Sequence, residues 1–107
     1  MKEVSKRALL LTTAAIPYNP TNYTIWHWRR KCLFELNEDL KEEMTFSEII
    51  MKRAPKNYQI WFHRREVIKK MENFDLENEF KVLKQCLLQE PKNYHAWSHR
   101  LNFKNIF

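Results

Sequence analysis

The stretches PTNYTIWHWRR (20–30), PKNYQIWFHRR (55–65) and PKNYHAWSHRL (91–101) decide the fold, because they are three copies of one motif. The copies start 35 and 36 residues apart and share the pattern Pro-x-Asn-Tyr-x-x-Trp-x-x-Arg. A period of this length is typical of one helix–turn–helix unit in an α-solenoid. The whole chain, residues 1–107, is therefore predicted to be all-α: a right-handed α-α superhelix of helical hairpins with about three repeats.

Each motif predicts the start of a helix. Proline fixes its own φ and disfavours helix in the residue before it, and Asn is a good N-cap two positions later. We expect helices to begin at Tyr23, Tyr58 and Tyr94. Apolar stripes between the motifs predict the partner helices. The expected helices span about 3–16, 23–36, 39–53, 58–71, 76–89 and 94–106.

The composition excludes several classes of site. The chain has 107 residues and no glycine, whereas a P-loop, a Rossmann phosphate turn and a nucleophile elbow all need glycines. No apolar run reaches the roughly 18 residues of a membrane span. The two cysteines form no CxxC pair, which argues against a zinc finger or a disulfide scaffold and favours a reducing, cytoplasmic location.

The positive charge raises nucleic-acid binding as an alternative. The formal net charge is +6, and Arg29-Arg30 and Arg64-Arg65 form basic pairs. These pairs occupy fixed positions of the repeat beside Trp, and the other basic residues are spread along the chain. No basic stripe emerges, so the sequence disfavours a nucleic-acid partner.

Positions filled alike in the copies are interpreted as framework, because every hairpin must bury the same faces. The tryptophans are expected to pack between helices, and the arginines to form ion pairs or stack on Trp. The two histidines share one slot of the repeat, and a metal or catalytic role is disfavoured for them. The two cysteines occupy unrelated slots and are expected to be small core residues. These residues are Trp26, Trp61 and Trp97; Arg29, Arg64 and Arg100; His63 and His99; and Cys32 and Cys86.

Function is expected where the copies differ, at the turn before each motif helix. In a solenoid such turns align along one edge, where helix N-termini expose unpaired N–H groups and a positive dipole end. Lys56 and Lys92 add positive charge there, and the motif tyrosines add phenol donors. The edge is suited to a phosphate, a diphosphate or a carboxylate. The alternative, solvated lysines and tyrosines that only cap, stays open from spacing alone.

The motif resembles the repeats of protein prenyltransferase α subunits. KNYQIW (56–61) and KNYHAW (92–97) are similar to the α subunit shared by farnesyltransferase and geranylgeranyltransferase type I. The resemblance implies a crescent of hairpins that wraps a β subunit. It places zinc in that β subunit, leaves magnesium open and assigns no metal or cofactor to this chain. The implied reaction joins farnesyl or geranylgeranyl, from its diphosphate, to the cysteine of a C-terminal CaaX motif.

The resemblance also implies roles for six residues. Lys56 matches the lysine that contacts the diphosphate as it leaves, and Tyr58, Tyr94 and His95 match residues on the diphosphate side. Gln59 matches the glutamine that hydrogen-bonds the CaaX carboxylate, and Tyr23 matches a tyrosine lining the pocket for the last CaaX residue.

Two further expectations concern the chain as a whole. The alternative function is a non-catalytic repeat scaffold for protein–protein interaction, similar to a tetratricopeptide array or to a prenyltransferase repeat without its β partner. The chain also ends within the third motif's helix on Leu101, Phe103, Ile106 and Phe107. Because terminal repeats normally present a polar face, we expect a piece of a longer solenoid.

Overall fold

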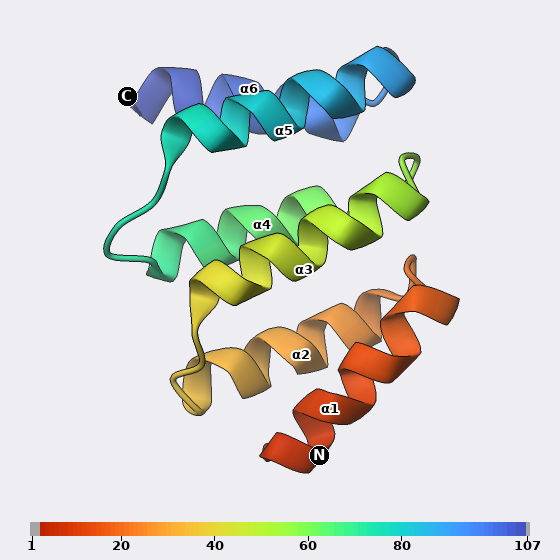
Figure 1. Ribbon diagram of the computed structural model, residues 1–107, viewed down its shortest axis with the longest axis vertical. Coiled ribbons are helices and arrows are strands. Elements are labelled where there is room, and N and C mark those ends of the chain that lie inside the picture. The colour runs from red at the N-terminus through yellow and green to blue at the C-terminus, as the bar shows by residue number, and fades with distance from the viewer. Residues whose placement is uncertain (1–2, 107) are drawn as a thin grey trace.

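The computed structural model describes residues 3–106, with side chains described up to residue 101. Within that range the fold is all-α, and six α-helices pair into three stacked hairpins (Figure 1). The expected fold class is thus confirmed. The helices are α1 (Lys6–Ala15), α2 (Tyr23–Glu35), α3 (Leu40–Arg53), α4 (Gln59–Lys70), α5 (Leu76–Gln89) and α6 (Tyr94–Ile106). The side chains of Phe103 and Ile106, and all of Phe107, lie outside the described part.

Side-chain caps explain where most helices begin. Oδ1 of Asn22 accepts from N of Ile25 at 3.1 Å, and Oδ1 of Asn93 accepts from N of Ala96 at 3.1 Å. These caps confirm the expected starts at Tyr23 and Tyr94. The first helix begins three residues later than expected, because Oγ of Ser5 accepts from N of Ala8 and sets the N-terminus there.

The expected start at Tyr58 was wrong by one residue. Oδ1 of Asn57 accepts from N of Gln59 at 2.9 Å, only two residues ahead, so Tyr58 itself is the N-cap and α4 begins at Gln59. The sequence also missed a short 3-10 helix, η1 (Ile16–Tyr18), after α1. Pro17 lies inside it, since Pro suits the first positions of a helical turn.

Asn37 is the left-handed residue that ends α2, a position that glycine occupies in many proteins. It has φ of 54°, the left-handed region, and directly follows Leu36, the C-cap of α2. N of Glu38 donates to O of Leu33 at 3.0 Å, and N of Asn37 donates to O of Phe34 at 3.4 Å. This is the Schellman pattern, and Asn tolerates its left-handed residue better than most side chains do. A chain without glycine can therefore still turn sharply between hairpins.

The core follows the motif tryptophans, with one exception. Trp26 and Trp61 are buried, and their rings lie 4.5 Å from His63 and 5.1 Å from His99, each in the following repeat. Trp97, by contrast, is 43% exposed, because no further hairpin covers it within the described residues. Cys32 and Cys86 are free and buried, as expected.

The turns that carry the motif align along one side of the molecule. Figure 1 shows the α1–α2, α3–α4 and α5–α6 turns on the right of the view, and the connections between hairpins on the left. The second helix of each hairpin therefore starts at the same edge. We call this edge, made of residues 18–24, 54–59 and 90–95, the turn edge.

Candidate functional site

Two repeats meet at the turn edge through a ring cluster. The Tyr58 and His95 rings stack with centroids 4.6 Å apart and an interplanar angle of 27°. Tyr94 meets the same imidazole edge-on, at 5.8 Å. Tyr58 and Tyr94 are 51% and 75% exposed, so these rings are accessible to a ligand. The structure thus brings together three of the four residues predicted on the diphosphate side.

The other predicted residues lie on the same edge without joining this cluster. Lys56 is exposed in the turn just before Asn57, and Gln59 is the half-buried first residue of α4. Tyr23 is the first residue of α2, and its ring stacks on His27 at 6.0 Å. Among the described residues, no ring contact joins Tyr23 to Tyr58 or His95.

Hydrogen bonds to proline carbonyls join consecutive turns. Nδ2 of Asn93 donates to O of Pro55 at 3.1 Å, and Nδ2 of Asn57 donates to O of Pro20. The Trp26 indole also donates to O of Pro20, at 2.8 Å. The Pro20 carbonyl therefore binds both Trp26 of its own repeat and Asn57 of the next one.

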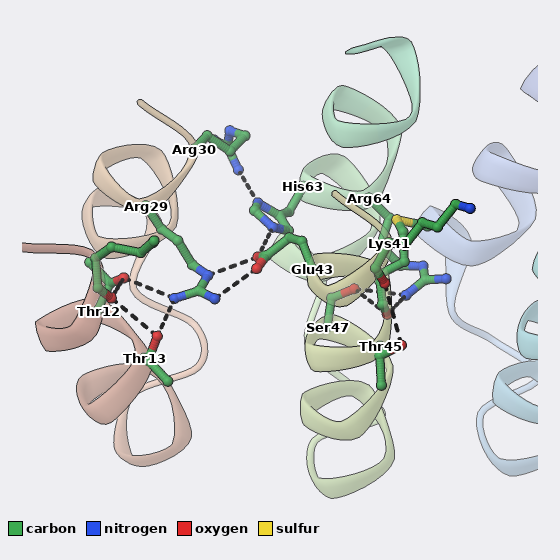
Figure 2. A network of polar contacts seen from close by, with 12 residues as sticks. Thr12, Thr13, Arg29, Arg30, Lys41, Glu43, Thr45, Ser47, His63 and Arg64 are labelled. Carbon is green, nitrogen blue, oxygen red and sulfur yellow. Dashed lines mark hydrogen bonds and ion pairs between the residues drawn. The ribbon is translucent and has the colours of Figure 1, made fainter. Parts of the chain in front are cut away.

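A buried polar network lies between the first two hairpins (Figure 2). Glu43 on α3 accepts from Nε and Nη2 of Arg29 on α2, at 2.8 and 2.7 Å. It also contacts Nε2 of His63 on α4, at 2.7 Å. The carboxylate is 3% exposed, so three helices converge on one desolvated charge. The bidentate Arg contact and the imidazole supply the partners that such a charge needs.

Hydroxyl groups accept further hydrogen bonds from the Arg29 guanidinium. Nη1 of Arg29 donates to Oγ1 of Thr12 at 3.0 Å and to Oγ1 of Thr13 at 2.7 Å (Figure 2). One repeat later, Nη1 of Arg64 donates to Oγ of Ser47 at 2.7 Å. Thr12 and Ser47 are 35 residues apart, so the hydroxyl belongs to the repeat.

The second junction repeats this network. Glu79 on α5 accepts from Nε of Arg64 at 3.0 Å and contacts Nε2 of His99 at 2.8 Å. Arg64, Glu79 and His99 are all at most 1% exposed. The interpretation of the motif arginines as ion-pair residues is confirmed for Arg29 and Arg64. Arg100, in the last repeat, is exposed.

The contacts of His63 define its protonation state. Nη1 of Arg30 lies 3.2 Å from Nδ1, and a guanidinium can only donate. Nδ1 must then be the acceptor, and the proton sits on Nε2, where it is donated to Glu43. Burial lowers the pKa of His63 despite the opposing pull of Glu43, and the charges of Arg30 and Arg29 lower it further. The imidazole is thus neutral.

Both acids remain ionised inside the protein. Burial alone would raise the pKa of Glu79, but hydrogen bonds from His99 and Arg64 outweigh it and lower the pKa to about 2. The pKa of Glu43 is lowered for the same reason, by His63 and Arg29 against the effect of burial. Each junction therefore holds a carboxylate, a guanidinium and a neutral imidazole at neutral pH.

The sequence reasoning missed both acids. Glu43 and Glu79 are 36 residues apart, which matches the spacing of the motif copies, so both acids belong to the repeat. Each follows its motif arginine by 14 or 15 residues and precedes the next motif histidine by 20. The signal is this 36-residue recurrence of Glu, which lies in the helix before each motif histidine and outside the motif itself.

Two further observations concern what the described residues contain. No group of three or more His, Cys, Asp or Glu side chains among them is arranged to hold a metal ion. None of the helices in that part of the chain combines the length and apolar character that crossing a membrane requires.

These observations define a class of protein: an α-α solenoid of helical hairpins whose repeats share a Pro-x-Asn-Tyr turn and a buried Arg–Glu–His junction. The family model for the protein prenyltransferase alpha subunit repeat matches residues 5–36, 40–71 and 76–103. The chain belongs to this family.

Relatives and a solved structure agree with that membership. The chain is 37% identical over 76 residues to the protein farnesyltransferase/geranylgeranyltransferase type-1 subunit alpha of Schizosaccharomyces pombe, covering 71% of this chain. It is 37% identical over 73 residues to the geranylgeranyl transferase type-2 subunit alpha of Dictyostelium discoideum, covering 60% of this chain. The structure of Candida albicans protein geranylgeranyltransferase-I complexed with GGPP matches 98% of this chain with a TM-score of 0.85 and 37% identity.

The relatives are longer than this chain. The chain spans 26% of the S. pombe protein, 24% of the D. discoideum protein and 37% of the matched C. albicans chain. Both type-1 and type-2 α subunits are among the matches, so family membership does not by itself select the substrate.

Proposed function

We propose that this chain is the part of a prenyltransferase α subunit that presents the turn edge to a β subunit and to the prenyl diphosphate. The observation that carries the proposal is the Tyr58–His95 stack at 4.6 Å with Tyr94 edge-on. It gathers exposed polar rings from two repeats at helix N-termini, where an anion is stabilised. The matched C. albicans enzyme, whose title names GGPP, supports a prenyl diphosphate as the ligand.

In the proposed reaction Lys56 acts on the leaving group. As the cysteine sulfur of the protein substrate bonds to the first prenyl carbon, the bond from that carbon to the diphosphate oxygen breaks and negative charge grows on the diphosphate. An ammonium placed beside that oxygen stabilises the transition state more than the ground state. Phenol donors at Tyr58 and Tyr94 and a donor at His95 add hydrogen bonds to the same oxygens. Zinc is proposed to be held by the β subunit, as the resemblance of the motif implies.

The proposed protein substrate is a CaaX tail. Gln59 can donate its amide N–H to a terminal carboxylate, and Tyr23 lies one repeat earlier on the same edge. The type-1 α subunits among the matches support a type-1 enzyme, and the resemblance of the motif implies CaaX tails as its substrate class. The type-2 match favours a second candidate, an α subunit of a Rab-directed enzyme.

Co-production with a type-1 or a type-2 β subunit tests these proposals. The chain is expressed alone and within the full reading frame that encodes it, and copurification with each β subunit is measured. Transfer of farnesyl and geranylgeranyl is then assayed on a CaaX peptide and on the same peptide with a C-terminal amide. The type-1 proposal expects pairing with the type-1 β subunit and transfer that requires the free carboxylate. Pairing only with the type-2 β subunit would favour the second candidate, the α subunit of a Rab-directed enzyme. Pairing with neither β subunit would favour the alternative function, a non-catalytic repeat scaffold.

A further inference from the structure

Asn57 and Asn93 each use both ends of the side-chain amide. Oδ1 of Asn93 caps α6 by accepting from N of Ala96, while Nδ2 donates to O of Pro55, both at 3.1 Å. Asn57 likewise accepts from N of Gln59 and donates to the Pro20 carbonyl. Both asparagines are at most 3% exposed, so these bonds are shielded from water. Each side chain therefore binds two consecutive turns at once.

The bond from Asn93 joins the two parts of the proposed diphosphate site. Its acceptor, Pro55, directly precedes Lys56, and Asn93 itself directly precedes Tyr94 and His95. Lys56 and Tyr94 are exposed, so their own side chains do little to fix the distance between the turns. A buried hydrogen bond between the two backbones is suited to that task.

A helix cap alone does not require asparagine. Ser and Asp cap about as well as Asn, because each supplies the oxygen that accepts the first N–H groups. Neither a Ser nor an Asp side chain has a second polar group that could donate to a carbonyl of the preceding repeat while its oxygen caps the helix. The amide N–H of Asn does this. Asn22 differs from Asn57 and Asn93 in this respect. Its Oδ1 caps α2 at 3.1 Å, but within the described residues no earlier motif turn precedes it.

We propose that Asn93 is a positioning residue whose Nδ2 donor sets the spacing between Lys56 and the Tyr94–His95 pair. Asn57 does the same for the turns that carry Tyr23 and Gln59. The spacing set by Asn93 is a property of the turn edge itself, and its catalytic consequence rests on the proposed function. The two asparagines thus divide the edge into a diphosphate half and a peptide half.

Asn93→Ser tests the geometry without an activity assay, because it keeps the cap and removes the amide donor. The His95 ring protons are shielded by the Tyr58 ring 4.6 Å away, so their NMR shifts report the stack. We expect Asn93→Ser to move these signals toward the values of a free imidazole while helicity by circular dichroism is retained. The matched variant Asn22→Ser should leave them unchanged. Unaltered His95 signals in folded Asn93→Ser would overturn the proposal. If Asn93→Ser is unfolded, Asn93→Asp is used for the same test, because it also keeps the capping oxygen and lacks the amide donor.

Kinetics of the αβ enzyme test the consequence. Asn93→Ser should lower kcat by about tenfold or more with the peptide KM unchanged, because small displacements of catalytic groups are costly. Asn57→Ser should instead raise the peptide KM. Wild-type kinetics in Asn93→Ser would overturn the catalytic part of the inference. An inactive wild-type complex whose NMR signals respond as expected would instead count against the proposed function alone.

Discussion

Glu79 on α5 and Arg64 on α4 form a bidentate ion pair that is buried between the second and third hairpins. Nε of Arg64 lies 3.0 Å from Oε2 of Glu79, and Nη2 pairs with Oε1. Arg64 also reaches Ser47, on the other helix of its own hairpin. One guanidinium therefore holds three helices together, and Arg29 does the same one repeat earlier.

Glu79→Gln should strongly destabilise the protein. The substitution keeps the shape but leaves the Arg64 guanidinium buried without its counter-charge, which typically costs about 3–5 kcal/mol. Urea denaturation at pH 7, followed by circular dichroism, measures the loss. Glu77→Gln is the matched control, because Glu77 is exposed in the same first turn of α5 and should cost less than about 1 kcal/mol. Equal losses in the two variants would contradict the role assigned to the junction.

Acid should weaken the fold in two steps. Burial lowers the pKa values of His63 and His99, so the unfolded chain binds more protons than the folded one below the free histidine pKa of about 6.5. The free energy of unfolding then falls as pH drops, by up to about 1.4 kcal/mol per pH unit for each histidine. The Glu79 contribution, about 3 kcal/mol, is lost later, between pH 4.5 and about 2.

Urea midpoints between pH 8 and about pH 2 measure both steps. His99→Gln should flatten the first step, since one of the two buried imidazoles no longer titrates. A midpoint that stays constant or rises from pH 7 to pH 5 would show that the buried histidines are not neutral in the folded state.

The repeat made most of the fold predictable, because a 35-residue period in a glycine-free chain leaves few alternatives to stacked hairpins. The turn edge was predictable too, since Asn22 and Asn93 cap the helices whose starts the motif predicts. The Arg–Glu–His junction was not predicted. Its acids lie outside the motif, on helices where charged residues usually face solvent, and only packing shows that Glu43 and Glu79 turn inward.

Trp61→Ala should cost far more stability than Trp97→Ala. Trp61 is 1% exposed and packs on His99 at 5.1 Å, whereas Trp97 is 43% exposed. Removing a buried large aromatic side chain typically costs about 3–5 kcal/mol, and the half-exposed position should lose less than half of that. Thermal and urea denaturation of the two variants provide the comparison. Similar losses would mean that the two motif copies carry the same packing despite their different exposure.

Lys56→Ala should slow prenyl transfer by about 10²- to 10³-fold in kcat, the usual cost of removing one group that stabilises transition-state charge. The peptide KM should stay close to the wild-type value, because Lys56 is proposed to contact the leaving diphosphate and not the CaaX tail. Single-turnover transfer by the αβ complex separates this effect from product release. Lys56→Arg should restore part of the rate, since it returns the charge with a different reach.

Two other lysines show whether position or charge alone matters. Lys92 occupies the slot of Lys56 in the next repeat, and Lys81 is exposed in the middle of α5. A specific contact to the leaving group predicts that Lys92→Ala costs much less than Lys56→Ala and that Lys81→Ala costs nothing measurable. If all three variants slowed transfer equally, the effect would come from the net positive charge of the chain. Lys56 would then have no distinct part in the reaction, and the turn edge would act only through its summed electrostatic field.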